Sequence, residues 1–323
     1  MNVAELLRLP GMGTSLERVE AALFRSVDTG EAFLGGVATH LIAAGGKRIR
    51  PALVVAAALA GGAEISDDVI QGAVSVELVH LGSLYHDDVI DEADSRRGVP
   101  SVNSRWGNLV AIVAGDFLLA RASEIAASLG TEVAGLLAAT IARLCEGEVA
   151  EIQHKFNPDR PEGAYLEAIR GKTASLMGTA CRVGALTAGL PRDDVDALTA
   201  FGEAFGMVFQ IRDDVLDIVG NEVTLGKPAG RDLVEGVYTL PVLRALAAPV
   251  AGPELRSLLG VPLDGPSRDK AREIVRESGG VEAACVVARQ YAEDAEAALG
   301  RLDGRVAIPA LAGLGHRLID AVA

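Results

Sequence analysis

The sequence predicts an all-α protein that folds as one large domain over residues 1–323, a helical bundle around a cavity. The composition is 50% hydrophobic but only 4% aromatic, with Ala, Leu and Val dominant, which favours helices packed on helices. Apolar residues recur at spacings of three and four, as at Val69, Ala73 and Val76, and no stretch alternates like a half-buried strand. No low-complexity linker divides the chain, so a single helical domain is the economical interpretation.

The first predicted helix follows a short lead-in that contains Pro10-Gly11. We expect Ser15 to be its N-cap, and the apolar pattern continues to about Ile42. Gly45-Gly46 then interrupts the pattern, and Pro51 lies where the first turn of another helix can begin.

The longest predicted helix covers residues 67–91. Further helices are expected near residues 107–128, 131–153, 163–189, 193–219, 237–247, 268–277, 280–300 and 307–321. The breaks between them fall at Asn157-Pro158, at Gly189-Leu190-Pro191, in the glycine-rich stretch 220–236 and between Gly260 and Pro266.

The charge balance argues against nucleic acid as a partner. The formal net charge is −14, and no basic stripe is present. The three cysteines, Cys145, Cys181 and Cys285, form no CxxC pair, which is typical of a reducing compartment. No signal sequence and no apolar run of the ~18–20 residues that span a membrane is evident, so we expect a cytoplasmic protein without a transmembrane segment.

Two aspartate clusters carry the main functional signal: Asp87-Asp88-Val89-Ile90-Asp91 and Asp213-Asp214-Val215-Leu216-Asp217. On a helix, the first and last Asp of each cluster differ by about 40° in direction and therefore share a face. Like charges on one face destabilise a helix unless a cation neutralises them, and Mg²⁺ binds a few carboxylates together with substrate phosphates. One such cluster alone could be a solvated acidic face, but two of them predict a phosphorylated substrate.

Basic and polar groups lie close to both clusters in the sequence. Gly45-Gly46-Lys47-Arg48-Ile49-Arg50-Pro51 combines glycines with three bases, and Arg96-Arg97-Gly98 follows the first cluster by five residues. Gly171-Lys172-Thr173 and Gly226-Lys227 supply two further cations, and Gln210 projects on roughly the same helical face as Asp213. In an acidic chain, this grouping predicts a binding site for diphosphate.

Together these residues resemble the trans-isoprenyl (polyprenyl) diphosphate synthases. The matching segments are GGKRIRP at 45–51, HDDVIDEADSRRG at 86–98, GKT at 171–173, FQIRDDVLD at 209–217 and GKPAGRDLVEGVYTLP at 226–241. The resemblance implies the isoprenoid synthase fold with a deep central cavity, usually in a homodimer. It also implies Mg²⁺-dependent condensation, with three ions, of isopentenyl diphosphate onto an allylic diphosphate such as geranyl or farnesyl diphosphate.

The resemblance assigns roles to individual residues. The metal ligands would be Asp87, Asp91, Asp213, Asp214 and Asp217, with Asp88 supporting them. The isopentenyl diphosphate site would contain Lys47, Arg50, His80 and Arg97. The allylic diphosphate site would contain Arg96, Lys172, Thr173, Gln210 and Lys227, where Thr173 and Gln210 support the transient carbocation. The residues expected to act in catalysis are Asp87, Asp88, Asp91, Lys172, Thr173, Gln210, Asp213 and Lys227. His80 could alternatively be a hydrogen-bonded core residue.

The residues before the first cluster predict the length of the product. Ser83 and Gly82 precede Asp87 by four and five residues, so they lie roughly 6–8 Å along the helix. In short-chain members of the family a bulky side chain near this depth forms a floor, whereas both residues are small here. We therefore expect a long all-trans product of C30 to C50, nearer C40–C50, released through transient membrane contact. The alternative is a short-chain synthase that makes C15–C20 products.

Two more distant alternatives remain at this stage. A class I terpene cyclase also uses a DDxxD helix, but it typically pairs that motif with a different second metal motif and needs no isopentenyl site. A partner subunit of a heteromeric synthase could lose its aspartates, but this chain has both clusters complete.

Overall fold

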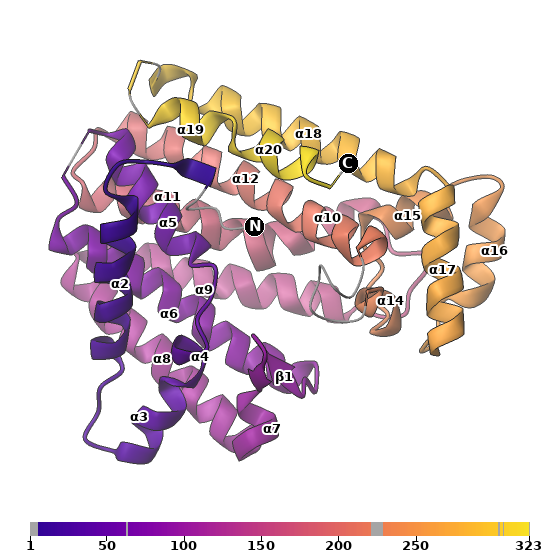
Figure 1. Ribbon diagram of the computed structural model, residues 1–323, viewed down its shortest axis with the longest axis horizontal. Coiled ribbons are helices and arrows are strands. Elements are labelled where there is room, and N and C mark those ends of the chain that lie inside the picture. Colours follow the sequence, from indigo (N-terminus) through magenta and orange to yellow (C-terminus); the bar gives the residue numbers. More distant parts are fainter. Residues whose placement is uncertain (1–5, 63, 221–228, 303, 306, 323) are drawn as a thin grey trace. The chain divides into compact units, whose positions relative to one another are not determined.

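The computed structural model describes residues 6–62, 64–220, 229–302, 304–305 and 307–322. These residues form helices and one small two-stranded sheet, so the all-α prediction is confirmed (Figure 1). They fall into two compact units, comprising residues 1–141, 176–202 and 299–311, and residues 142–175, 203–298 and 312–323. The single domain and the deep central cavity stay predictions.

The first unit is built around the long helix α6. Its helices are α2 (Met12–Ser26), α3 (Ala32–Ala38), α4 (His40–Ala43), α5 (Ile49–Ala60), α6 (Asp67–Ile90), α7 (Val102–Trp106), α8 (Asn108–Ser128), most of α11 (Ser175–Thr187), the 3₁₀ turn Gly300–Leu302 and most of α19 (Ile308–Ala312). Helix α6 packs against α2, α5 and α8. Ten of the twelve residues of α5 are buried, as expected of a helix enclosed on all sides.

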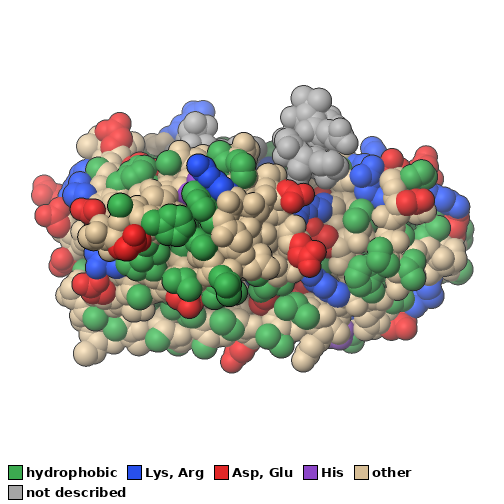
Figure 2. Space-filling model, turned by 90° about the horizontal axis from the view of Figure 1, so that it is seen from below, with side chains coloured by type: hydrophobic (Ala, Val, Ile, Leu, Met, Phe, Trp, Pro, Cys, Tyr) green, Lys and Arg blue, Asp and Glu red, His purple; other side chains and the backbone are tan. Residues whose placement is uncertain are grey.

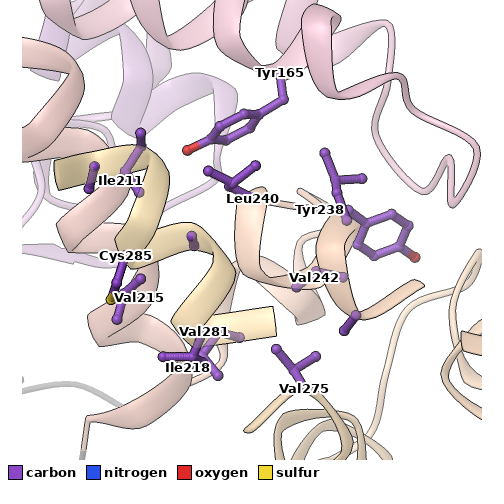
Figure 3. Packing of buried hydrophobic residues seen from close by; sticks show 14 of the residues in the cluster. Tyr165, Ile211, Val215, Ile218, Tyr238, Leu240, Val242, Val275, Val281 and Cys285 are labelled. Carbon is purple, nitrogen blue, oxygen red and sulfur yellow. The ribbon is translucent and has the colours of Figure 1, made fainter. Parts of the chain in front are cut away.

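The second unit surrounds a core of aliphatic and tyrosine side chains (Figure 3). Its helices are α10 (Glu162–Ile169), the π-helical turn Arg170–Ala174, α14 (Arg231–Val234), α15 (Leu240–Leu246), α16 (Ala251–Leu258), α17 (Gly265–Glu277), α18 (Gly280–Ala298) and α20 (Leu314–Asp320). Helices α9 (Thr131–Ile152) and α12 (Arg192–Val219) contribute residues to both units.

Helix α6 confirms the predicted long helix and carries the first aspartate cluster. The Ser66 hydroxyl accepts a hydrogen bond from the Val69 amide at 3.3 Å, and Asp67 and Asp68 complement the helix dipole in the first turn. The helix ends at Ile90, with Asp91 as its C-cap. The cluster therefore occupies the last turn of a helix whose preceding turns are anchored in the core.

The N-terminal region differs from the predicted single helix. Helix α2 begins at Met12, after Gly11 in a left-handed conformation, and the Ser15 hydroxyl donates to the Gly11 carbonyl at 2.8 Å. The N-cap prediction for Ser15 was therefore wrong. A second helix, α3, begins after Glu31 because the Glu31 carboxylate accepts from the amides of Phe33 and Leu34. This side-chain cap, which the apolar pattern does not reveal, divides the predicted helix.

Several further elements escaped the sequence prediction. Strands β1 (Ser95–Arg96) and β2 (Val99–Pro100) form an antiparallel hairpin that is too short to show an alternating pattern. The predicted helix 163–189 is interrupted by the π-helical turn at Arg170–Ala174. Three short helices, α7, α14 and α16, lie in stretches for which we predicted no helix.

On the face shown in Figure 2, basic side chains lie among acidic and hydrophobic ones. The absence of a nucleic-acid partner stays a prediction. None of the described helices combines the length and the apolar character that crossing a membrane requires.

Candidate active site

The first aspartate cluster divides into one buried and two more exposed residues. The Asp91 amide donates to the Asp87 carbonyl at 2.8 Å, so these residues are one turn apart on the helix. Both are partly exposed, whereas Asp88 is 0% exposed. One Asp88 oxygen accepts from Nε of Arg96 at 2.7 Å and lies 2.6 Å from its Nη2. Asp88 therefore orients Arg96, and its auxiliary role stays a prediction.

Two basic loops meet beside this cluster. Arg97 has a left-handed backbone conformation, and its guanidinium donates to the carbonyls of Leu41, at 3.1 Å, and Gly45. A Cβ atom on Gly46 would lie 2.8 Å from the guanidinium carbon of Arg97, so only glycine permits this approach without a shift. The double glycine of the sequence thus allows the loop before α5 to pack on the loop after α6.

The residues predicted to bind isopentenyl diphosphate gather in this region of the first unit. Burial lowers the pKa of Arg50 to about 10, although the nearby carboxylates of Glu77 and Asp87 oppose that effect, so Arg50 is charged at neutral pH. Its Nε is buried and has no hydrogen-bond partner among the described residues. Lys47, three residues earlier, is exposed. Burial, together with the charges of Arg50, Arg97 and two further arginines, lowers the pKa of His80 well below 6.5.

Since His80 is neutral at pH 7, the His80→Gln substitution should preserve activity near the wild-type level, whereas His80→Ala should raise the KM for isopentenyl diphosphate. The folded-state pKa is depressed, so the unfolded state binds more protons below pH 6.5 and stability falls as the pH decreases. This loss amounts to at most about 1.4 kcal/mol per pH unit. Urea unfolding at pH 5.5 and 7.5 should show a larger acid-side loss for the wild type than for His80→Gln. Equal losses would contradict a neutral His80.

The second aspartate cluster lies on α12, and its residues differ in exposure. The side chain of Asp213 is 39% exposed and accepts from Arg212 at 2.8 Å. Asp214 is buried and accepts from the Tyr165 hydroxyl at 2.5 Å and from the Gln210 amide at 2.8 Å. Its burial raises its pKa to about 7. Figure 3 shows Tyr165 at the edge of the apolar core of the unit.

Asp217 is also buried, and its carboxylate accepts from the backbone amides of Arg231 and Asp232 at 3.3 and 3.1 Å. It therefore fixes the start of the short helix α14. Among the three aspartates of this cluster, Asp213 is the most exposed, and its leading role stays a prediction. The ligand roles of Asp214 and Asp217 stay predictions.

The π-helical turn presents Lys172 and Thr173 in the second unit. A Cβ on Gly147 would lie 2.4 Å from the Lys172 amide nitrogen, and a Cβ on Gly206 would lie 2.5 Å from the Cα of Ala174. These two glycines let α9 and α12 approach the turn closely. The Thr173 hydroxyl donates to Oε1 of Gln210 at 2.7 Å, so two predicted residues of the allylic site contact each other.

Several residues that the sequence analysis did not select take part in these networks. Lys172 lies 2.6 Å from the carboxylates of both Glu148 and Glu151, which are three residues apart on α9. Tyr165 fixes Asp214, and Glu77 lies among the arginines of the first unit. Glu77 had a visible signal, since it is a lone acid within the apolar run Val74–Val79. The other partners are distant in sequence, so only the folded chain reveals them.

The remaining predicted residues concern chain length and the glycine-rich segment. Gly82 packs against α8, where an added Cβ would lie 3.1 Å from the Gly115 carbonyl oxygen. Ser83 is partly exposed, and its hydroxyl donates to the His80 carbonyl at 2.9 Å. Lys227 lies outside the described residues.

The partly exposed carboxylates can bind a metal ion that the substrate phosphates also coordinate. Within the part of the chain that the structure describes, no three carboxylate, imidazole or thiolate groups converge to enclose a metal ion. Mg²⁺ does not require such a cage, because it is usually bound by one or two carboxylates together with water and substrate phosphates. The partly exposed pair Asp87 and Asp91, one turn apart, fits this mode of binding, and so does Asp213.

The fold and these residues define an enzyme of isoprenoid metabolism. A family model described as polyprenyl synthetase matches residues 31–277, well over half of the sequence, so the chain belongs to the polyprenyl synthetase family. The predicted resemblance is therefore confirmed, and with it the enzyme class of the trans-polyprenyl diphosphate synthases.

Individual relatives match along most of their length. The heptaprenyl diphosphate synthase component 2 of Geobacillus stearothermophilus is 43% identical over 282 residues, 87% of this chain and 86% of the relative. The nonaprenyl diphosphate synthase of Mycobacterium tuberculosis is 40% identical over 302 residues, 91% of this chain and 89% of the relative. These names agree with the predicted long-chain type. Geranylgeranyl diphosphate synthases are also among the matched proteins.

A solved structure confirms the predicted fold class. The polyprenyl synthase from Caulobacter crescentus, complexed with calcium and isoprenyl diphosphate, is 34% identical and has a TM-score of 0.92. The match covers 100% of this chain and 98% of that chain.

Proposed function

We propose that this protein condenses isopentenyl diphosphate onto an allylic diphosphate with a divalent metal ion, and that it extends the product to C30–C50. One observation carries the proposal. Each aspartate cluster has its second residue buried and fixed by the protein, while its first residue is more exposed, in a sequence context rich in cations. More exposed carboxylates of this kind can bind Mg²⁺ together with substrate phosphates, which supports the proposal.

In the first unit, Lys47, Arg50 and Arg97 would bind the diphosphate of isopentenyl diphosphate. Neutral His80 would add a hydrogen bond without adding charge. In the second unit, Lys172 would exchange its two glutamate partners for a phosphate oxygen of the allylic substrate. The family resemblance also assigns Arg96, which Asp88 orients, and Lys227 to the allylic diphosphate.

The reaction breaks the allylic C–O bond, and its electron pair leaves with the diphosphate. The double bond of isopentenyl diphosphate then forms the new C–C bond, and a proton is lost to the released diphosphate. Thr173 donates its proton to Gln210, so the lone pairs of its own oxygen remain available to stabilise the allylic cation. Bound at Asp87, Asp91 and Asp213, Mg²⁺ would supply further stabilisation of the departing negative charge. Calcium in the Caulobacter structure supports a divalent ion, and the number of ions stays a prediction.

The direct test incubates the purified protein with labelled isopentenyl diphosphate, several allylic starters and Mg²⁺, and then measures product length by chromatography. We expect C30–C50 products that disappear on addition of EDTA. Cyclic hydrocarbons formed without isopentenyl diphosphate would instead indicate a terpene cyclase. Products that stop at C15 or C20 would indicate a short-chain synthase.

A second candidate is a catalytic subunit that needs a partner, because one relative is named component 2 of its synthase. The same assay on the protein alone separates the two cases, since a subunit of this kind would make no product by itself. Light scattering on the same sample tests the predicted homodimer. A cytoplasmic location and transient membrane contact also stay predictions.

Replacing Lys47 by alanine should raise the KM for isopentenyl diphosphate by roughly tenfold to a hundredfold, the equivalent of one charge-assisted hydrogen bond. The KM for the allylic substrate should change by less than about twofold. Because Lys47 is exposed, the fold should not be affected. Lys270→Ala, which removes a lysine paired with Glu254, serves as the control. Equal effects of Lys47→Ala on both substrates would contradict separate diphosphate sites.

A further inference from the structure

Glu77 is a buried carboxylate in the middle of an apolar helix. It is 1% exposed, and its neighbours Val76, Leu78 and Val79 on α6 are fully buried. A charge in this position is costly unless other groups compensate it. The compensation comes from the arginine cluster, which we define as Arg48, Arg50 and Arg97.

The arginine cluster converges on this carboxylate from the start of α5, which carries Arg48 and Arg50, and from the turn between β1 and β2, which carries Arg97. Arg48 donates to Oε1 of Glu77 at 3.0 Å, and Nη2 of Arg97 lies 4.0 Å from the same oxygen. For Arg50, Glu77 is the largest charge that favours the protonated guanidinium. Without this carboxylate, three like charges would remain close together in a poorly solvated region.

Two members of the arginine cluster also form hydrogen bonds with groups other than Glu77. Glu20 accepts from Nε and Nη2 of Arg48 at 2.7 and 2.8 Å, and Arg97 donates to the carbonyls of Leu41 and Gly45. Arg50 has no such anchor, and its buried Nε lacks a partner among the described residues. The position of Arg50 therefore depends on the electrostatic environment that Glu77 creates.

We propose that Glu77 is a positioning residue that assembles the arginine cluster before isopentenyl diphosphate binds. This inference rests on the proposed function, which assigns Arg50 and Arg97 to that diphosphate. Being buried, Glu77 acts through the arginines and not by contact with substrate. Glu77 keeps the three arginines close together in the free enzyme despite their like charges. The site is therefore preorganised, and binding of the diphosphate does not require free energy to bring the arginines together.

The test compares Glu77→Gln with Glu20→Gln, which removes a carboxylate that is 38% exposed and contacts Arg48 alone within the arginine cluster. Glu77→Gln should raise the KM for isopentenyl diphosphate by roughly tenfold to a hundredfold, with the allylic KM changed by less than about twofold. Glu20→Gln should change both by less than about twofold. Glu77→Asp, which keeps the charge, should restore part of the affinity. A purely structural role predicts lower thermal stability and less active enzyme, with both KM values unchanged, and that result would overturn the proposal.

A double variant, Glu77→Gln with Arg48→Gln, covers the case in which the single variant does not fold. Removing both partners of a buried pair is often tolerated, so the double variant should recover stability. It should nevertheless keep the raised KM, because Arg50 and Arg97 still lack their carboxylate. A wild-type KM in the double variant would mean that Glu77 only neutralises Arg48, and the proposal would be wrong.

Binding of inorganic diphosphate, measured by calorimetry, separates this proposal from the proposed function. The wild type could make no prenyl product and yet bind diphosphate with an affinity that Glu77→Gln lowers. In that case the positioning role stands and the proposed function fails. If the wild type makes the product and Glu77→Gln binds diphosphate normally, the proposed function stands and the positioning role fails.

Discussion

Asp87→Ala and Asp213→Ala should each leave a folded protein whose kcat is lower by roughly a hundredfold to a thousandfold, or more. Both carboxylates are expected to hold metal ions that stabilise the departing diphosphate. Removing one strong electrostatic contributor from such a site costs about 3 kcal/mol or more in the transition state. Since both side chains are partly exposed, alanine creates no cavity in the core. Turnover should be measured over a series of Mg²⁺ concentrations, because loss of a ligand also raises the concentration needed for half-maximal activity.

The matched control is Asp94→Ala, which removes an exposed acid three residues after the first cluster. It should retain the wild-type kcat and the wild-type response to Mg²⁺. Thermal unfolding of all three variants should show that the fold is intact. Near-normal turnover in Asp87→Ala or Asp213→Ala would exclude the metal assignment for that residue.

The parts of the site that are local in sequence could be predicted. The last turn of α6 fixes the geometry of Asp87 and Asp91, because a helix alone sets the relation between residues four apart. Gly46 was likewise recognised as part of a glycine-containing basic segment, although the close approach of Arg97 to it was not. In both cases the chemistry depends on spacing or on the properties of one residue.

The parts that depend on tertiary contacts could not be predicted. Lys172 looked like a cation available for diphosphate, yet two glutamates more than twenty residues earlier in the chain neutralise it. Asp214 resembled its neighbours in sequence, and the hydrogen bonds from Tyr165 and Gln210 distinguish it. The close packing of α9 and α12 on the π-helical turn needs Gly147 and Gly206, and this packing has no signature in the periodicity of the segment itself.

The structure also refines the argument about product length. Tyr85, the bulky residue nearest to the first cluster, is buried, and its hydroxyl donates to the Val37 carbonyl at 2.7 Å. It therefore packs in the core of the first unit. Gly82 faces α8, where a larger side chain would displace Leu119 or the Gly115 backbone. Of the two small residues that we assigned to chain length, only Ser83 has a partly exposed side chain.

Ser83→Phe should shift the products from C30–C50 to C15–C20, with little loss in the rate of the first condensation. The phenyl ring would lie one turn before Asp87, about 6 Å along the helix, where it would block a chain that grows towards the start of α6. Ser83→Ala is the control and should leave product length unchanged. Gly82→Phe should instead lower the stability by about 1–3 kcal/mol or more through overpacking against α8, without a comparable shift in product. Chromatography of the products from all three variants measures the outcome. A wild type that already stops at C15 or C20, or a Ser83→Phe enzyme that still makes the long chain, would show that the product does not grow along this face of α6.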